Sequence, residues 1–369
     1  MMTTVLFTLL LATHGAIHLI GVARAFELAP VPLEKSIGAG EGLLWGGAAL
    51  LLLAAAAVLW LAPRWWWLPA LVGVVLSQVL VFGAWEDARW GTLANLAILL
   101  PALVAAADLR PGSLRSTWER EVRSVEADAA AGAEVVSEQD LNDLPTPVAR
   151  WMRRIGVVGR PIPSTVRIAF DIRIRGGAEE PWMDGQGVQV TRVDPPVRLF
   201  LMTARKAGLP VHVLHRYADG AATMEGRLLG IVPIFHHSGE EMTRSETVTL
   251  LNDLFFVAPT GLLDTGVRWT PIDDRRAGVE WTHAGHTVAA EVRFDAAGDL
   301  VDFVSEDRSQ MDRDPPVRAR WSTPFSAYAT FDGVRLPAAG QATWGAGEAA
   351  WPYVELEVRD VTFDPGLPR

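Results

Sequence analysis

The stretch STVRIAFDIRIRG (residues 164–176) alternates apolar and polar side chains with a period of two. Val166, Ile168 and Phe170 fall on one side of an extended chain, and the arginines fall on the other. Such alternation is typical of a long β-strand with one buried face and one face in water. The sequence therefore predicts a sheet here.

Strand-like runs recur at short spacing on the C-terminal side of this stretch, through residues 187–230 and 266–363. Turn signals such as DDRRAG (residues 273–278) and AAGD (residues 296–299) separate them. Short strands at this spacing favour a mostly antiparallel sheet that curls into a barrel or half-barrel. We expect the same sheet to continue through most of the C-terminal two-thirds of the chain.

One helical pattern interrupts the strands, in TRSETVTLLNDLFFVAP (residues 243–259). Thr243 and Glu246 have the spacing of a capping box, and Pro259 ends the pattern, which predicts a helix over residues 246–258. Its broad apolar stripe consists of Leu250, Leu251, Leu254, Phe255 and Ala258. A helix across the mouth of a curled sheet either lines a cavity for an apolar ligand or fills the sheet as a plug. The sequence leaves both readings open.

A second, short helix is predicted before the first strand, in TPVARWMRRIG (residues 146–156). Its apolar residues recur at i, i+3, i+4 and i+7, and Gly156 is placed as a C-cap. The preceding residues 110–145 are charged and rich in alanine, which predicts a linker with a helix and a flexible joint. We therefore expect three parts: residues 1–109, 110–145 and 146–369.

The N-terminal part carries four apolar runs, at residues 5–22, 42–61, 68–84 and 93–107. Each is near the length of about 20 residues that a helix needs to cross a membrane. Tryptophans gather between the runs, as they do at membrane interfaces. The expected fold class is therefore an α+β membrane protein, a four-helix transmembrane bundle followed by a β half-barrel with an inserted helix.

The first apolar run is expected to be a retained span and not a signal peptide, because no cation precedes it and two histidines interrupt it. Four spans place both termini on one side of the membrane. The side that carries the tail holds slightly more arginine, which favours a cytoplasmic β-domain. We expect a multi-pass protein of the bacterial inner membrane.

A set of polar residues is predicted to lie in the membrane half away from the tail domain, with His14 deeper, near mid-span. It comprises His14, His18, Glu41, Glu86, Asp87 and Asn95. Ionisable groups in hydrocarbon are costly and commonly functional, so a proton or polar-solute site and a metal site are two alternatives, and either would give the bundle a transport, proton or redox role centred on His14 and His18. The third is that the carboxylates lie among headgroups and the histidines hydrogen-bond neighbouring helices. Haem is disfavoured, because two histidines on one helix face cannot bind opposite sides of one iron.

Composition and motifs exclude several functions. The net charge of −10 and the lack of a basic patch argue against nucleic acid, and the chain has no cysteine. The sequence lacks the zinc-protease, nucleophile-elbow, P-loop and dinucleotide motifs. No catalytic residue and no cofactor are predicted. A hydrolase would need His236, Glu240 and Asp307 to converge, and it remains an alternative.

Four phrases carry a resemblance to a known family: HGAIHLIG (14–21), LLNDLFFVAPTGLLDTGVRWTPID (250–273), VRFDAAGDLVDFVSEDR (292–308) and WSTPFSAYATFDGVRLP (321–337). The chain resembles an uncharacterised family of bacterial membrane proteins with a C-terminal domain of unknown function. The order of strands and helix is also similar, at the level of fold, to the half-barrel of periplasmic lipoprotein carriers. The family implies no activity, so no functional residue is carried over. The predicted curled sheet and its apolar helix at residues 246–258 lead us to expect a module that binds an apolar or lipid-like ligand near the membrane.

Overall fold

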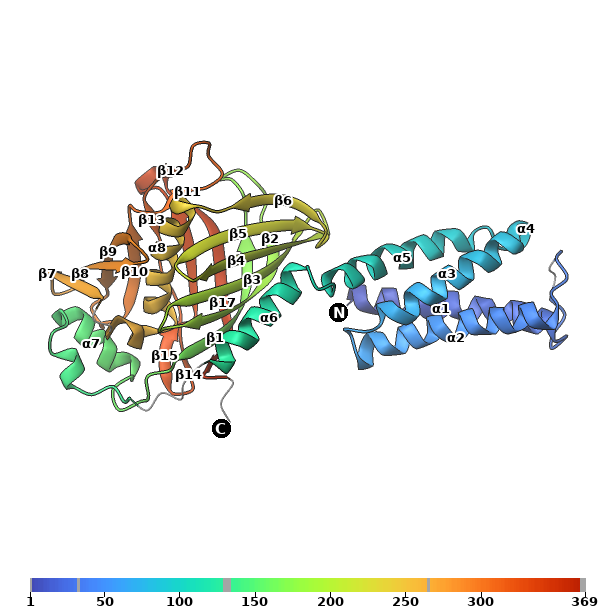
Figure 1. Ribbon diagram of the computed structural model, residues 1–369, viewed down its shortest axis with the longest axis horizontal. Helices are drawn as coiled ribbons and strands as arrows, with labels where there is room; N and C mark the ends of the chain where they lie inside the picture. Colours follow the sequence, from blue (N-terminus) through green and yellow to red (C-terminus); the bar gives the residue numbers. More distant parts are fainter. Residues whose placement is uncertain (1, 32–33, 129–133, 264–265, 366–369) are drawn as a thin grey trace. The chain divides into compact units, whose positions relative to one another are not determined.

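The structure is a computed structural model that describes residues 2–31, 34–128, 134–263 and 266–365 (Figure 1). The chain divides into two compact units, Met1–Ser113 and Leu114–Arg369. We call them the helical unit and the β-unit and describe each by itself.

The helical unit consists of apolar helices. Three of its helices are long and apolar enough to cross a membrane: α1 (Met2–Ala25), α2 (Ala39–Leu61) and α5 (Gly91–Asp108). A shorter apolar helix, α3 (Trp67–Gly83), and a single turn, α4 (Trp85–Ala88), lie between α2 and α5 in the chain. All four predicted apolar runs are helical. At about 1.5 Å per residue, α3 is short for a span of about 30 Å.

Small residues let α1 and α2 approach closely. A Cβ atom placed on Gly21 would lie 2.4 Å from the ring of Trp45, and one on Gly42 would lie 2.3 Å from Cβ of Ala25. Helices in lipid associate through such close packing, because lipid tails are as apolar as leucine and supply no hydrophobic drive. The sequence of α1 and α2 therefore specifies their pairing through glycine.

The β-unit is built on one large antiparallel sheet. Its strand order is β6-β5-β4-β3-β2-β1-β17-β16-β13-β10-β9-β8-β7. The strands are β1 (Thr165–Ile174), β2 (Met183–Arg192), β3 (Val197–Lys206), β4 (Leu209–Ala218), β5 (Ala221–Leu228), β6 (Val232–His237), β7 (Val267–Asp273), β8 (Arg276–His283), β9 (His286–Phe294), β10 (Leu300–Ser305), β13 (Trp321–Ser322), β16 (Ala339–Trp344) and β17 (Trp351–Phe363). Two small sheets accompany it, β11 (Ser309–Gln310) with β12 (Val317–Arg318) and β14 (Tyr328–Phe331) with β15 (Val334–Pro337).

The stretch that predicted the sheet is its central strand. In β1, Val166, Ile168, Phe170 and Ile172 are buried, as the alternation requires. The predicted antiparallel sheet with an inserted helix is confirmed. The short helix α7 (Thr146–Ile155) is also confirmed, and Gly156 ends it in the left-handed region at φ 79°.

The helix α6 (Leu114–Ala127) lies against one face of the sheet. Trp118 donates its indole N–H to the carbonyl of Leu199 at 3.0 Å, and its apolar side packs on β3 and β4. Sequence analysis placed these residues in a linker. They belong to the β-unit instead, because one face of α6 is apolar and is buried against the sheet.

The helix α8 (Glu240–Phe256) covers the other face of the sheet (Figure 1). In the chain it lies between β6 and β7, which are the two edge strands of the sheet. It begins six residues before the predicted start at residue 246. Gly239 precedes it, and Thr243 lies inside the first turns, where its hydroxyl donates to the carbonyl of Gly239 at 2.9 Å. Thr243 is therefore an interior residue of the helix and not its N-cap. The same hydroxyl accepts the backbone N–H of Ala222 in β5, so it joins α8 to the sheet.

Candidate functional site

The apolar stripe predicted for this helix is packed against the concave face of the sheet, and its last residue, Ala258, lies two residues beyond the end of α8 at Phe256. Leu250, Leu251, Leu254, Phe255 and Ala258 are each at most 4% exposed. Phe255 contacts the rings of Trp151, Trp269 and Phe303, with centroids between 5.8 and 5.9 Å apart. The five residues predicted to line a cavity thus lie together in the main core, with α8 in the position of a plug.

A cluster of buried charged side chains joins α8 to the sheet at the same place. Arg198 of β3 donates through Nε to Asp253 at 2.7 Å and through Nη1 to Glu246 at 3.1 Å. Both carboxylates come from α8, one near each end of its buried segment. Gln189 of β2 also donates to Asp253, at 2.8 Å. One arginine on the sheet therefore holds two points of the helix.

A second arginine completes this cluster from the opposite side. Arg308 donates to Glu246 at 3.3 Å, to the hydroxyl of Thr249 at 3.1 Å and to the hydroxyl of Tyr353 at 2.8 Å. Its guanidinium also lies over the ring of Trp321, 4.8 Å from the centroid. We call Arg198, Glu246, Asp253 and Arg308 the ionic latch. Its formal charges balance, with two cations against two anions.

His215 borders the latch as a neutral neighbour. Its Nδ1 lies 3.6 Å from a carboxylate oxygen of Glu246. Burial lowers the pKa of the His215 imidazole, although Glu246 raises it. Burial alone raises the pKa of Glu246, but His215, Arg198 and Arg308 hold that pKa below its ordinary range. Glu246 is therefore ionised at neutral pH and is not placed to act as a general acid.

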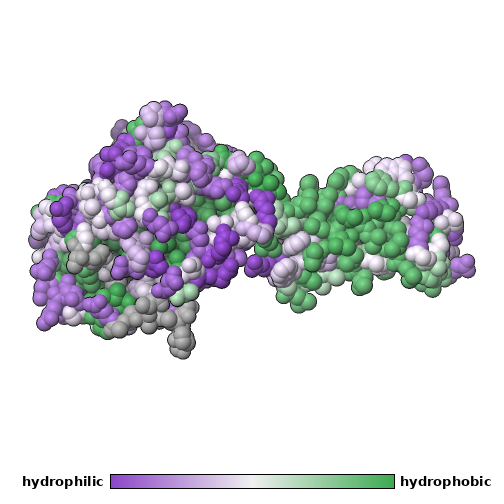
Figure 2. All heavy atoms as spheres, in the orientation of Figure 1, coloured by the Kyte–Doolittle hydropathy of each residue, from purple (hydrophilic) through white to green (hydrophobic). Residues whose placement is uncertain are grey.

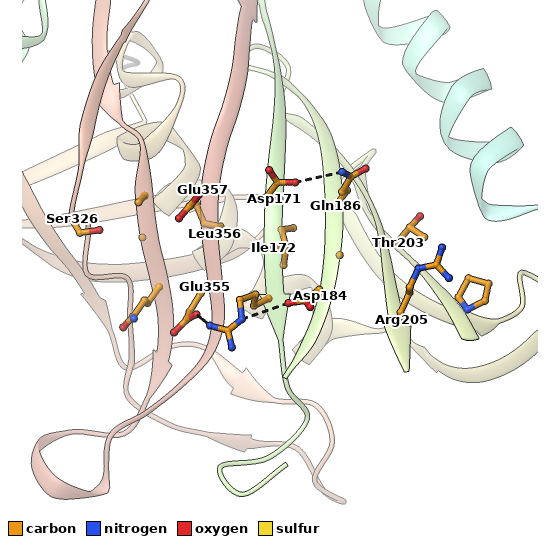
Figure 3. Close-up of a pocket in the computed structure, with 16 residues that line it drawn as sticks. Asp171, Ile172, Asp184, Gln186, Thr203, Arg205, Ser326, Glu355, Leu356 and Glu357 are labelled. Carbon is orange, nitrogen blue, oxygen red and sulfur yellow. Dashed lines mark hydrogen bonds and ion pairs between the residues drawn. The ribbon is translucent and has the colours of Figure 1, made fainter. Parts of the chain in front are cut away.

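A hollow on the β-unit lies elsewhere and has a mixed polar and apolar lining (Figure 3). It has a volume of about 850 Å³ and is lined mainly by water-facing residues of β1, β2 and β17. Arg173 pairs there with Glu355 at 2.8 Å and with Asp184 at 3.6 Å. Neither this hollow nor the second one, beside Asp273 and Arg293, includes a residue of α8. The lining combines these ion pairs with apolar side chains such as Ile172 and Leu356.

The helical unit brings three of its six predicted polar residues together. His14 hydrogen-bonds with Asn95 at 2.8 Å, and His18 lies with its ring centroid 4.8 Å from that of His14. Ser77 of α3 hydrogen-bonds with His18 at 2.8 Å and lies 3.4 Å from His14. These neutral side chains connect α1, α3 and α5.

The three predicted carboxylates have other partners. Glu41 pairs with Lys35, and Glu86 lies 3.8 Å from Arg89. Asp87 accepts the backbone N–H groups of Glu34 and Lys35, each at 3.1 Å. Within the described ranges, no group of three histidine or carboxylate side chains is arranged to hold a metal ion.

Sequence reasoning missed several members of both clusters. In the helical unit, Gln78 accepts from Asn95 at 3.0 Å and donates to Thr92 at 3.1 Å. The adjacent pair Ser77 and Gln78 in an apolar run was the available signal. In the β-unit, Arg198 occupies an inward position of β3 by strand alternation, which marks a buried charge. The pairing of Arg308 with Glu246 could not be predicted from the sequence around either residue.

The hydrolase candidates are distributed over separate elements. His236 lies in the edge strand β6, and Glu240 is the first residue of α8. Asp307 accepts the backbone N–H of Ala289 at 2.8 Å. None of the described hydrogen bonds or ion pairs joins any two of these three residues.

Comparisons with known proteins address family and fold. A domain described as an outer membrane lipoprotein-sorting protein, from Vibrio parahaemolyticus, is similar with a TM-score of 0.34 and 12% identity, over 56% of this chain and 88% of that one. A LolA superfamily protein from Nitrosomonas europaea is similar with a TM-score of 0.30 and 11% identity, over 63% of this chain and 96% of that one. A DUF1329 family protein from Desulfovibrio piger is similar with a TM-score of 0.32 and 13% identity, over 64% of this chain and 96% of that one. Curated proteins give no match to the sequence. The family of unknown function DUF6544 matches residues 134–356, and the chain belongs to that family.

Proposed function

We propose that the helical unit anchors the protein in a membrane and that the β-unit binds an apolar, lipid-like ligand between α8 and the concave face of the sheet. The observation that carries this proposal is the placement of α8. It connects the two edge strands of an open sheet and covers the apolar concave face as a separate element. In this proposal, the ligand takes the place of the apolar stripe when α8 moves away.

The apolar part of this exchange is close to balanced, and opening the ionic latch is a cost in addition to it. Burying one large apolar side chain contributes about 1.5–3 kcal/mol, so the stripe contributes roughly 10 kcal/mol. An acyl chain of about fourteen methylenes contributes about 11 kcal/mol at about 0.8 kcal/mol each. A single acyl chain can therefore restore the burial that α8 gives up, and the aromatic side chains of Phe170, Trp269 and Phe303 would line its path.

The ionic latch supports a movable helix better than a permanent one. A buried ion network contributes little net stability compared with apolar packing of the same volume, but it specifies one arrangement. It makes the closed position of α8 a discrete state, since Glu246 and Asp253 have their partners only there.

The test uses the full chain in lipid nanodiscs that contain a fatty acid with a diazirine on its acyl chain. After illumination, labelled peptides are mapped by mass spectrometry. Label on α1 and α2 is expected wherever the helices meet lipid and serves as the internal control. Label on residues 250–258 and on β1 supports the proposal, and label confined to the helical unit contradicts it.

A proton or solute route through the helical unit is the second candidate. A continuous hydrogen-bonded chain favours it, running from His18 through Ser77, His14, Asn95 and Gln78 to Thr92. The amides of Asn95 and Gln78 interrupt a proton relay, however, because an amide N–H does not release its proton at neutral pH. The neutral chain therefore fits interhelical hydrogen bonding better than conduction.

A further inference from the structure

One end of the large sheet carries an apolar surface that the proposed ligand site does not use. In an antiparallel meander, alternate turns lie at the same end of the sheet, so the β3–β4 and β5–β6 turns are neighbours there. The backbone N–H of Leu229 donates to the carbonyl of Pro210, which joins the two turns. Leu209, Ile231, Val232 and Ile234 are between 44% and 52% exposed at or beside these turns. We call these four residues the apolar tip, and Figure 2 shows apolar surface at this end of the β-unit.

The apolar tip lies partly on an edge strand. β6 is the outermost strand of the sheet and reads VPIFHH, with its first, second and third residues exposed. Natural proteins usually protect an exposed edge with charge or cover it, since an open apolar edge invites association. Pro233 is the one such device within this run. We therefore expect this apolar surface to be covered by a binding partner or by lipid.

Exposed cations lie beside the tip at the end of β3, and the more distant β1–β2 turn carries a tryptophan together with the exposed carboxylates of Glu179 and Glu180. Arg205 and Lys206, at the end of β3, are exposed. The β1–β2 turn lies at the same end of the sheet and carries Trp182, with the guanidinium of Arg175 4.6 Å from its ring centroid. Apolar side chains flanked by cations and tryptophan are the composition of a surface that enters the headgroup region of an anionic membrane.

The length of the chain connection limits how far the start of α6 can lie from the end of the last candidate span. The last candidate span, α5, ends at Asp108, and α6 begins at Leu114, so five residues separate them. An extended chain reaches at most about 3.5 Å per residue, which limits the link to roughly 20 Å. Figure 1 shows α6 crossing the sheet with its first turn toward the β5–β6 turn, and Trp118 fixes α6 to β3. The tip is thus at the end of the β-unit where the chain enters it.

We propose that the apolar tip inserts into the lipid surface of the membrane that holds the helical unit. The occupant is lipid and not a second copy of the chain, because the exposed Arg205 and Lys206 complement anionic headgroups and because only five residues connect this end of the β-unit to the last candidate span. The inference rests on the membrane anchoring proposed above and is independent of a ligand beneath α8.

The absence of native cysteine makes a single-label experiment direct. Val232→Cys is labelled with a nitrobenzoxadiazole fluorophore in the full chain, in nanodiscs without quencher lipids and in nanodiscs with lipids that carry a doxyl quencher either near the headgroup or at the middle of the acyl chain. The expected result is a blue-shifted emission that the quencher lipids reduce. Ile272→Cys is the matched control, since Ile272 is 44% exposed on the opposite edge strand β7, and its label is expected to keep its emission.

A third label separates this inference from the anchoring itself. Val75 is 62% exposed on α3, so Val75→Cys reports whether the helical unit lies in lipid. Quenching at Val75 without quenching at Val232 overturns the tip proposal alone. A Val232 signal that depends on protein concentration and not on the quencher also overturns it, in favour of self-association. Arg205→Glu/Lys206→Glu is expected to reduce the quenching in anionic lipid and to leave it unchanged in neutral lipid.

Discussion

Both units bury polar side chains between apolar elements, and they satisfy them in opposite ways. The helical unit uses neutral groups, in which His14, His18, Ser77 and Asn95 exchange single hydrogen bonds between helices. The β-unit uses full charges, in which two arginines of the sheet region hold two carboxylates of α8. The hydrogen bonds of the helical unit join helices that also pack against one another through apolar side chains. The ionic latch instead determines where a single helix, α8, lies on the sheet.

The difference teaches how much each cluster tolerates. Hydrogen bonds between membrane helices contribute about 1–2 kcal/mol at most, because an unpaired group finds other partners. Removing one partner of a buried ion pair costs about 3–5 kcal/mol, because a bare charge remains in the core. Loss of a partner should therefore be tolerated in the helical unit and damaging in the β-unit.

The largest effect is expected for Arg198→Met. This change leaves Asp253 with Gln189 as its remaining partner and removes one cation from Glu246. We expect the β-unit to lose about 3–5 kcal/mol of unfolding free energy. The measurement is urea unfolding of the full chain in detergent, followed by the circular dichroism of the strands.

Arg216→Met is the matched control for this prediction. Arg216 lies on the neighbouring strand and pairs with Glu121 at 2.7 Å, but its side chain is 31% exposed. Its loss should cost about 1 kcal/mol or less, as for other exposed pairs. Equal losses for the two variants would show that the latch is no more demanding than a surface pair.

A smaller effect is expected at Asp302, which is a partly buried carboxylate with one cation at the limit of ion-pair distance. Its Oδ1 has no hydrogen-bond partner among the described residues, and Arg293 lies 3.8 Å from Oδ2. Burial raises the pKa of Asp302 to about 6, although Arg293 lowers it. We expect Asp302→Asn to increase the unfolding free energy by about 1–3 kcal/mol at pH 7, at about 1.4 kcal/mol per pKa unit.

The pH dependence of that effect has a definite sign. A carboxyl whose folded pKa exceeds its unfolded value binds more protons in the folded state, so it destabilises the fold increasingly as the pH rises. The advantage of the asparagine should be near zero below about pH 4 and complete above about pH 7. Unfolding at several pH values checks it, and a gain that is independent of pH would reject the buried, poorly paired carboxylate.

The smallest effect is expected for His18→Ala in the helical unit. The change removes hydrogen bonds to Ser77 and to the backbone of His14, each at 2.8 Å. A loss of about 1 kcal/mol is expected in a denaturing-detergent titration, with little further loss when Ser77→Ala is added. Unchanged stability with altered proton movement across liposomes would instead favour a conducting role.

The sequence was sufficient for the elements whose periodicity is local. The alternation in β1 and the stripe of α7 predicted both elements, and their buried residues are those that the pattern selected. The large antiparallel sheet with an inserted helix was also predictable. The start of α8 was not, since Thr243 interacts with Gly239 and with β5 and not as the expected cap.

The candidate sites were less accessible from the sequence, because their members meet only in three dimensions. His14 and Asn95 could be grouped by depth, but the pairing of His18 with Ser77 depends on how α1 and α3 pack. Arg198 and Arg308 lie 110 residues apart and meet through Glu246. Neither arginine occupies a motif, so only the fold reveals the latch.

The central claim is that α8 must leave the sheet to admit an apolar ligand, and a reversible lock tests it directly. Ser309 donates its backbone N–H to the hydroxyl of Ser245 at 3.0 Å, beside the ion pair of Glu246 and Arg308. In Ser245→Cys/Ser309→Cys, a disulfide would hold α8 closed, and the reduced protein is the matched control. The account predicts diazirine fatty-acid label on residues 250–258 in the reduced protein and none in the oxidised one. Equal label in both states, or none in either, would contradict it.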